Sequence, residues 1–593
     1  IRLLLLVGPM VAEGVNCPLG EQGAQGERHV RAGHHLLDGY GADPGETSPA
    51  VVGIERDGAV AGIDQLAVCR FELVGSGDRA VLVPLAPDHV TRSVRGSEDL
   101  GHEPADFFEY EVDGLGIDVA ELLGGQQAIE INHGVQHETD VATRRRIVSH
   151  DREAIGSRPM ALDPSVGDPS VDSSLLARAR RLPFVPSTPP LTVVGAEGND
   201  LLTADGRRVL DAAGGAVVNN IGYGRPEMAE TAAAALAGNG YVVPVFATEH
   251  RMRLLERITG GWLPPGMNRA IFVNGGSESV DTALRVVRQY QLAMGRPDKW
   301  KVLGRSISYH GATLASLAVA NHDRRKAPFG PMMLDLPKVD PWDADAVIKT
   351  MEAEDPATIG GLILEPVIGA SGAAIVSPDD YWPKLRAFCD AHDILLVADE
   401  VMSGVGRTGR RFGVDHWDVV PDLLVGSKGL AGGYAPMGGV FATDRVVEAL
   451  AGETVMYFTF SGNDLSCALA DRTLQILEDE NLVERAATMG DVLRAALVDQ
   501  LAEHPHVIDI RGKGLLLGVE LVRDRDTGAG FDGALTPLII EEALARDCWI
   551  YPAGSGPVAD ALLYGPSFTV TESEIDRIAT ITRQALDAAV ARI

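Results

Sequence analysis

Short apolar runs alternate with amphipathic stretches in the part of the chain that follows Met160. The apolar runs are continuous rather than alternating, which is typical of parallel strands buried on both faces of a sheet. They cover residues 270–273, 361–367, 394–401 and 423–426. Residues 378–392 carry apolar positions at helical spacing, with Ser377 as the expected N-cap and Pro378 in the first turn. This order of elements predicts an α/β fold with functional groups at the carboxyl ends of the strands.

Residues 1–159 have a different character. They contain no lysine, 13 arginines and 26 acidic residues, and few stretches keep a helical or strand period. We expect this segment to be an atypical N-terminal extension, either poorly ordered or an over-extended reading of the gene, with Met160 as the natural start. The alternative is a genuine accessory domain. Residues 160–593 are long enough to form a complete enzyme-sized unit.

The charge and cysteine content narrow the classes of function. The chain has 52 basic and 83 acidic side chains, a net charge of −31, which disfavours binding to nucleic acid or anionic membranes. The longest apolar runs are too short to span a bilayer. The five cysteines form no CxxC pair, so we expect neither disulfides nor a metal site. These features predict a cytoplasmic protein that acts on small molecules.

The first candidate site is the strand at 270–273 that runs into Gly275, Gly276 and Ser277 and then into a helical pattern. Glycines allow backbone amides to approach an anion, the serine adds a hydroxyl, and the helix N-terminus favours negative charge. The segment therefore predicts a phosphate-binding turn. It lacks the lysine of a P-loop, so an ordinary strand-to-helix turn remains the alternative.

Two further strands end in ionisable groups. The strand at 394–401 ends in Asp399 and Glu400, and a carboxylate buried there needs a metal or a protonated ring nitrogen as partner. The strand at 423–426 ends at Lys428, flanked by glycines, and a desolvated lysine has the lowered pKa of an imine-forming nucleophile. A solvated surface lysine is the alternative. Together, the predicted phosphate-binding turn, Asp399 and Lys428 predict pyridoxal 5′-phosphate as the cofactor.

With these residues in place, the sequence resembles the class III, or omega, aminotransferases of the pyridoxal-phosphate fold type I. The resemblance covers nearly all of residues 180–593. It is carried by motifs in the family's order and spacing, which are Asn274-Gly275-Gly276-Ser277-Glu278, Tyr309-His310-Gly311, Glu365-Pro366, Asp399-Glu400-Val401, Gly404-Val405-Gly406-Arg407-Thr408-Gly409, Ser427-Lys428-Gly429 and Thr459-Phe460-Ser461-Gly462-Asn463.

The resemblance implies roles for residues around the cofactor ring. Lys428 would bind the cofactor aldehyde and then move a proton between substrate and cofactor. Asp399 would keep the pyridine nitrogen protonated. Tyr309 and Val401 would pack on opposite faces of the ring, unless both are plain core residues.

The resemblance also implies roles at the phosphate and at the substrate. Gly276 and Ser277 would bind the phosphate, and Thr459 would reach the phosphate of a neighbouring subunit, which implies a homodimer with shared active sites. Glu365 resembles the family's gating glutamate near the substrate. A strand-end carboxylate that caps a turn is the alternative for Glu365.

The implied architecture is a large domain with a mostly parallel central sheet between helices, and a smaller α+β domain. The large, cofactor-binding domain would cover 231–480. The smaller domain would combine its N-terminal part, 160–230, with its C-terminal part, 481–593.

Two departures from the family pattern bear on the substrate. Met402 stands where many members have glutamine after the Asp-Glu-Val triplet. Residues 562–568 contain no arginine, although members specific for α-amino acids often place one there to bind the substrate carboxylate. This absence favours amines, ω-amino acids or another way of binding the carboxylate.

The predicted activity is ping-pong transfer of an amino group from an amine, ω-amino acid or amino acid to a keto acid. An aminomutase or decarboxylase of the same fold is the alternative within enzymes. Outside enzymes, residues 1–159 could be the arm of a pyridoxal-phosphate-binding regulator. That arm carries 13 basic and 26 acidic residues, a balance opposite to the one DNA requires.

Overall fold

The computed structural model describes residues 191–451, 456–531 and 533–593, apart from the side chains of residues 323 and 324. Before residue 191 it describes only the backbone of five short strands, which are β1 (Leu3–Val7), β2 (Met10–Val15), β3 (Ala50–Val52), β4 (Cys69–Val74) and β5 (Val81–Leu85). The chain divides into two compact units, Ile1–Ile155 and Gly156–Ile593.

In the first unit, β1 and β2 form an antiparallel pair, and β3, β4 and β5 form a three-stranded antiparallel sheet. The rest of residues 1–159 lies outside the described residues. The expectation that this segment is an atypical extension therefore stays a prediction.

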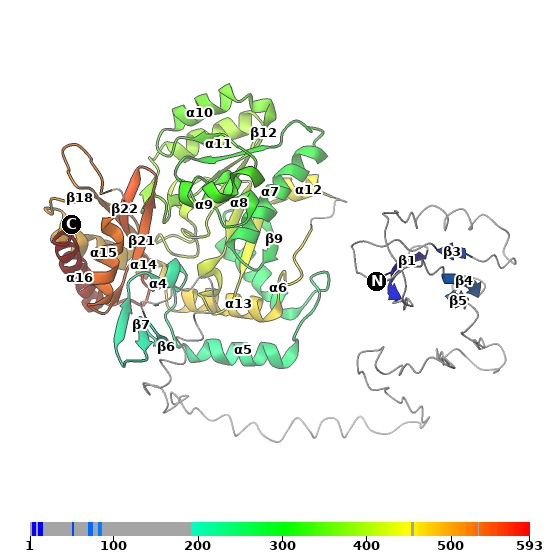
Figure 1. Ribbon diagram of the computed structural model, residues 1–593, viewed down its shortest axis with the longest axis horizontal. Helices are drawn as coiled ribbons and strands as arrows, with labels where there is room; N and C mark the ends of the chain where they lie inside the picture. Colours follow the sequence, from blue (N-terminus) through cyan, green and yellow to red (C-terminus); the bar gives the residue numbers. More distant parts are fainter. Residues whose placement is uncertain are drawn as a thin grey trace, which may run out of the picture. The chain divides into compact units, whose positions relative to one another are not determined.

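A seven-stranded sheet forms the centre of the second unit (Figure 1). The strand order is β11-β10-β12-β15-β16-β17-β9, and the neighbours are parallel except where β17 pairs. The sheet is therefore mostly parallel, which confirms the prediction. The strands are β9 (Met267–Val273), β10 (Lys301–Arg305), β11 (Lys338–Val339), β12 (Ile359–Leu364), β15 (Leu395–Asp399), β16 (Leu423–Gly426) and β17 (Gly438–Thr443).

Both faces of this sheet are apolar and covered by helices. Val397 packs on one face in a cluster that includes buried residues of α7 (Gly276–Ala293). Its neighbour Leu396 packs on the other face with Leu424 and with buried residues of α11 (Tyr381–Ala391). Consecutive strand residues thus enter different clusters, because side chains alternate between the faces of a sheet. Burial of both faces explains why the strands read as continuous apolar runs.

Helix α11 begins at Tyr381, later than the sequence predicts. Asp380 occupies the N-cap position and no side chain caps the helix, so the prediction of Ser377 as N-cap is wrong. The hydroxyl of Ser377 instead accepts a hydrogen bond from the buried guanidinium of Arg305 at 2.7 Å. Pro378 lies in the preceding turn, where its carbonyl accepts from the Tyr381 amide.

One four-stranded sheet joins the beginning and the end of the second unit, and a second four-stranded sheet is formed by the C-terminal segment alone. One has the order β20-β8-β7-β6, in which β20 pairs in parallel with β8, and the other is the antiparallel sheet β18-β19-β22-β21. The N- and C-terminal segments thus build a smaller α+β part, as the resemblance implies. Their strands are β6 (Val193–Glu197), β7 (Asp200–Thr203), β8 (Arg208–Asp211), β18 (Val507–Lys513), β19 (Leu516–Leu521), β20 (Cys548–Trp549), β21 (Tyr551–Ser555) and β22 (Val558–Tyr564).

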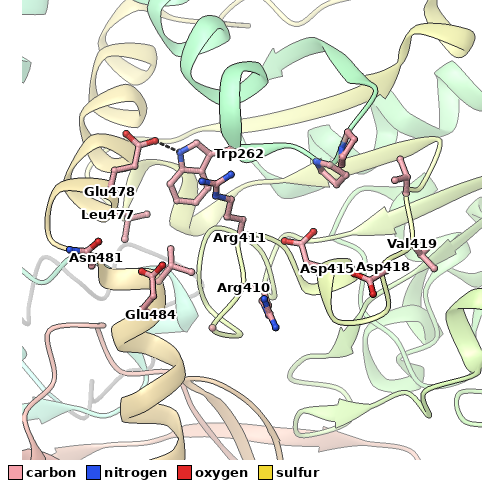
Figure 2. Close-up of a pocket in the computed structure, with 15 residues that line it drawn as sticks. Trp262, Arg410, Arg411, Asp415, Asp418, Val419, Leu477, Glu478, Asn481 and Glu484 are labelled. Carbon is pink, nitrogen blue, oxygen red and sulfur yellow. Dashed lines mark hydrogen bonds between the residues drawn. The ribbon is translucent and has the colours of Figure 1, made fainter.

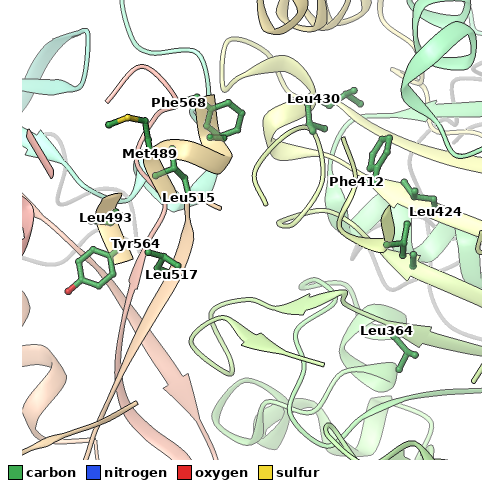
Figure 3. Packing of buried hydrophobic residues seen from close by; sticks show 14 of the residues in the cluster. Leu364, Phe412, Leu424, Leu430, Met489, Leu493, Leu515, Leu517, Tyr564 and Phe568 are labelled. Atoms are coloured by element: carbon green, nitrogen blue, oxygen red, sulfur yellow. The ribbon is translucent and has the colours of Figure 1, made fainter. Parts of the chain in front are cut away.

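One hydrophobic cluster links the central sheet to this smaller part. It includes Leu424 and Phe412 from the large sheet region together with Leu515, Tyr564 and Phe568 from the C-terminal segments (Figure 3). The other long helices are α5 (Pro226–Gly238), α6 (Glu249–Arg257), α10 (Ala344–Ala353), α13 (Asp464–Asp479), α14 (Leu482–Leu501), α15 (Leu535–Leu544) and α16 (Glu572–Val590). Within the described residues, no helix is both long and apolar enough to cross a membrane.

Candidate active site

The carboxyl ends of five strands meet at one edge of the central sheet, because β9, β10, β12, β15 and β16 all run in the same direction. In open α/β sheets this edge is where ligands bind. Each of these strands ends at or just before residues singled out in the sequence, which are Gly276 and Ser277, Tyr309, Glu365, Asp399, and Lys428.

Lys428 follows β16 and is partly buried. Its Nζ donates a hydrogen bond to the carbonyl oxygen of Ala216 at 3.0 Å. Burial lowers the pKa of Lys428 to about 8, although the negative charges of Asp399 and Glu365 act in the opposite direction. Its φ of 41° lies in the left-handed region, which a side chain other than glycine adopts at a cost. The lysine is therefore held in a strained position where its neutral, nucleophilic form is accessible near neutral pH.

Asp399 ends β15 and is 4% exposed. Its Oδ2 lies 2.6 Å from Nδ1 of His310, and its Oδ1 accepts a hydrogen bond from the Val401 amide at 3.1 Å. His310 is also buried, and its Nε2 has no hydrogen-bond partner. A carboxylate bonded to a histidine is fixed in orientation while it keeps acceptor capacity for another donor.

Glu365 directly follows β12, and burial raises its pKa to about 7. The nearby charge of His310 opposes this increase, whereas that of Asp399 adds to it. Its Oε2 is buried without a partner. Its backbone carbonyl accepts from the guanidinium of Arg305 at 2.7 Å, and Arg305 also donates to the Tyr381 hydroxyl at 3.1 Å. Arg305 thus fixes the backbone of Glu365, while Oε2 of the carboxyl group stays without a partner among the described residues.

The turn before α7 has the features of an anion site. The N-cap residue Gly275 provides no side-chain hydrogen bond, so the first amides of α7 have no side-chain cap. A Cβ at Gly276 would lie 2.9 Å from Cγ1 of Val401, which brings this backbone close to the end of β15. The Oγ of Ser277 accepts from the Ala312 amide at 3.0 Å and keeps its own proton for an anion.

Of two further predicted residues, Tyr309 lies next to a residue of the site, whereas Thr459 makes no described contact with the site. Tyr309 is partly buried next to His310, and the guanidinium carbon of Arg325 lies 4.6 Å from the centre of its ring. Thr459 is exposed, and its described contact is with Tyr241, whose hydroxyl donates to the Thr459 carbonyl at 2.9 Å. Within the described part of the chain, Thr459 is not brought into contact with Lys428 or Asp399.

These residues fit pyridoxal 5′-phosphate. The lowered pKa of Lys428 suits an aldehyde, the buried Asp399 suits a protonated ring nitrogen, and the uncapped start of α7 at Gly276 suits a phosphate. The buried, unpartnered Oε2 of Glu365 is consistent with a polar group bound beside it.

A surface pocket of about 790 Å³ lies elsewhere (Figure 2). The indole nitrogen of Trp262 donates to Glu478 at 2.6 Å on one side of it, and Arg411 lies over the Trp262 ring. Its lining contains none of the predicted site residues. This pocket is therefore separate from the cluster around Lys428.

Three parts of the site are not predicted from the sequence. His310 lies in a motif of the family, but its role as the hydrogen-bond partner of Asp399 is seen only in the structure. The carbonyl of Ala216 and the guanidinium of Arg305 also contact predicted residues from distant segments. The position of His310 just after a buried strand was a usable signal, but a backbone carbonyl leaves no mark in a sequence.

Known proteins that are similar to this chain are aminotransferases. Residues 185–586 match the family model "Aminotransferase class-III". The chain is 33% identical to the putrescine–pyruvate aminotransferase of Pseudomonas aeruginosa over 68% of this chain and 91% of that protein. It is 34% identical to the taurine–pyruvate aminotransferase of Rhodobacter capsulatus over 69% of this chain and 93% of that protein.

Among solved structures, the (S)-enantioselective omega-transaminase of Thermomicrobium roseum matches with a TM-score of 0.66 and 32% identity, over 71% of this chain and 98% of that one. These matches confirm the fold, the pyridoxal-phosphate cofactor and the transfer of an amino group from a donor to a keto acid. The chain belongs to the class III aminotransferases.

Proposed function

We propose that Lys428 and Asp399 are the catalytic residues of this aminotransferase. The observation that carries the proposal is the position of Lys428, which is partly buried at a strand end with its pKa lowered by burial to about 8. When bound, pyridoxal 5′-phosphate supplies an aldehyde for the amino group and a ring that accepts the electrons of the broken C–H bond. Lys428 moves the proton from the substrate carbon, and Asp399, oriented by His310, holds the proton on the ring nitrogen.

We further propose that five residues hold the cofactor around this pair. The first amides of α7 at Gly276 and the hydroxyl of Ser277 bind the phosphate. Tyr309 and Val401 pack on opposite faces of the ring. Glu365, with a free carboxyl oxygen, lies at the substrate side. A neutral Glu365 near pH 7 can donate a hydrogen bond as well as accept one.

We propose that the enzyme is a homodimer in which Thr459 binds the phosphate of the neighbouring subunit. Thr459 lies in a group of exposed apolar side chains, an arrangement that is typical of a protein interface. Phe460 is 58% exposed and makes an edge-to-face contact with Tyr241, which itself bonds to the Thr459 carbonyl. Other exposed apolar residues near these in sequence are Val245, Phe246, Met456 and Tyr457.

For the substrates, we propose an amine or ω-amino acid as donor and pyruvate as acceptor. Support comes from two relatives, which are named as a putrescine–pyruvate aminotransferase and a taurine–pyruvate aminotransferase. It also comes from residues 562–568, which lack an arginine that could bind an α-carboxylate.

We also propose that the enzyme acts in the cytoplasm, a location supported by the described cysteines, which are free and buried. We retain the domain division at residues 160–230, 231–480 and 481–593 as a proposal.

An absorbance titration tests the function directly. Purified protein and the Lys428→Ala variant would be mixed with putrescine, taurine, β-alanine and propylamine, and the visible band of the cofactor followed. We expect the band of the wild-type enzyme to bleach with at least one donor and to recover with pyruvate. The variant should show no lysine-linked band. Bleaching without release of a carbonyl product would instead indicate an aminomutase or decarboxylase.

A further inference from the structure

A cation near Lys428 would favour the binding of an acidic substrate, and two arginines are candidates. Burial is the main cause of the lowered pKa of Lys428, and the positive charges of Arg407 and Arg325 lower it further. Both guanidinium groups are therefore close enough to act on charges at the lysine. Residues 562–568, where related enzymes often place an arginine, contain none.

Arg407 is already used by the fold. It is 3% exposed, and its guanidinium donates hydrogen bonds to the carbonyls of Asn219, Leu515 and Pro566. It also lies over the ring of Phe568 at 4.6 Å. A guanidinium with its donors directed at backbone carbonyls has little capacity left for a substrate.

Arg325 is in the opposite situation. Its side chain is exposed, and its guanidinium carbon lies 4.6 Å from the centre of the Tyr309 ring. No carboxylate whose side chain is described forms an ion pair with it. Contact with the face of the Tyr309 ring positions the guanidinium group and does not use its N–H groups as hydrogen-bond donors. These donors match the paired oxygens of a carboxylate or sulfonate.

We propose that Arg325, held against Tyr309, binds the acid group of the substrate, either the carboxylate or the sulfonate of an ω-amino donor or the carboxylate of the keto acid. This inference rests on the proposed function and names the residue that recognises its acidic substrates. Tyr309 thereby has two contacts, the cofactor ring and the substrate-binding arginine. Arg325 does not contribute to the affinity for an amine that has no acid group.

The test uses the donor half-reaction of the cofactor-loaded enzyme, in which no keto acid is present. β-Alanine and propylamine are compared because they differ only at the terminal carbon, which is a carboxylate in β-alanine and a methyl group in propylamine. For Arg325→Gln we expect the apparent dissociation constant of β-alanine to rise roughly 10- to 100-fold, as for the loss of charge-assisted bonds. The value for propylamine should stay within about twofold. Arg325→Lys should lie between, since it keeps the charge but loses the planar fork.

Arg253→Gln is the matched control, because Arg253 is an exposed arginine paired with Glu249 on α6. It should leave both donors unchanged. Equal weakening of β-alanine and propylamine in Arg325→Gln, or no weakening of either, would overturn the proposal.

A binding measurement separates this inference from the proposed function. Isethionate carries the sulfonate of taurine without its amine, and its binding to the loaded enzyme can be followed by calorimetry. Loss of binding in Arg325→Gln supports the proposal even if no donor reacts, which would contradict only the proposed function. Equal binding by the wild-type enzyme and Arg325→Gln, or no binding by the wild-type enzyme, contradicts the role of Arg325.

Discussion

Nδ1 of His310 lies 2.6 Å from Oδ2 of Asp399, and both side chains are buried at the carboxyl edge of the central sheet. The pair joins the ends of two strands, because Asp399 ends β15 and His310 follows β10. A buried carboxylate is stable only with such a partner. His310 therefore acts as a positioning residue that sets the direction of the Asp399 carboxylate, for which we propose a catalytic role.

Replacement of His310 by phenylalanine tests this role. The carboxylate of Asp399 would lose its charge-assisted hydrogen bond, so we expect about 1–3 kcal/mol lower stability and weaker cofactor binding. Cofactor affinity would be measured by fluorescence titration and stability by urea unfolding. His506→Phe is the control, because His506 bonds to the Val522 carbonyl rather than to the site. Loss of stability with unchanged cofactor affinity would show that His310 is only structural.

The lowered pKa of Lys428 makes a prediction about chemical modification. Because only the neutral amine reacts, reductive methylation of Lys428 in cofactor-free protein should be half-maximal near pH 8. The control is Lys384, whose pKa is raised by hydrogen bonds to Asp345 and Asp380, so it should react only at much higher pH. Peptide mass spectrometry after modification at a series of pH values gives both curves. Coincident curves for the two lysines would contradict the assignment.

Because Gly276 lies close to Val401, we expect the methyl group added by Gly276→Ala to weaken cofactor binding. Gly276→Ala places a Cβ 2.9 Å from Cγ1 of Val401, a distance at which one of the two segments must move. Because we propose that the start of α7 at Gly276 binds the cofactor phosphate, we expect cofactor affinity to fall at least about tenfold. Val401→Ala removes the clashing methyl groups, so Gly276→Ala should lower cofactor affinity less in the Val401→Ala background than in the wild-type enzyme. An equal loss of affinity in both backgrounds would mean that the contact with Val401 is not the cause.

The sequence predicted the central strands well, because their identity depends on local pattern. Residues 423–426 are buried on both faces, and their run of apolar side chains can be read without knowledge of any neighbour. Polar residues at the ends of these runs were easy to recognise against the apolar pattern. Lys428 and Asp399 stood out because each directly follows such a run.

The contacts between distant segments could not be predicted. Ser377 has the pattern of an N-cap, yet its hydroxyl bonds to Arg305 from a different strand, and the helix begins later. The bond from Lys428 to the carbonyl of Ala216 joins residues more than two hundred positions apart. Such pairings depend on how the chain packs, and no local spacing encodes them.

Glu400, which directly follows Asp399, predicts a pH dependence of stability. It is 1% exposed, accepts hydrogen bonds from Ser403 and from the Val414 amide, and burial raises its pKa from 4.5 to about 7. Between these two values the folded protein keeps a proton that the unfolded chain releases. The free energy of unfolding therefore falls as pH rises through this window, by up to about 1.4 kcal/mol per pH unit, and changes no further above it.

Glu400→Gln removes this titration. The amide also disturbs one hydrogen bond at every pH, so the informative quantity is the slope rather than the absolute stability. The quantity to follow is the free energy of unfolding of the wild-type protein minus that of Glu400→Gln, measured by urea unfolding. We expect this difference to decrease between pH 5 and pH 7 and to level off at pH 8. Glu249→Gln, at an exposed position on α6, should give a flat difference. A flat difference for Glu400→Gln as well would mean that Glu400 is ionised throughout this range, held by its hydrogen bonds from Ser403 and Val414.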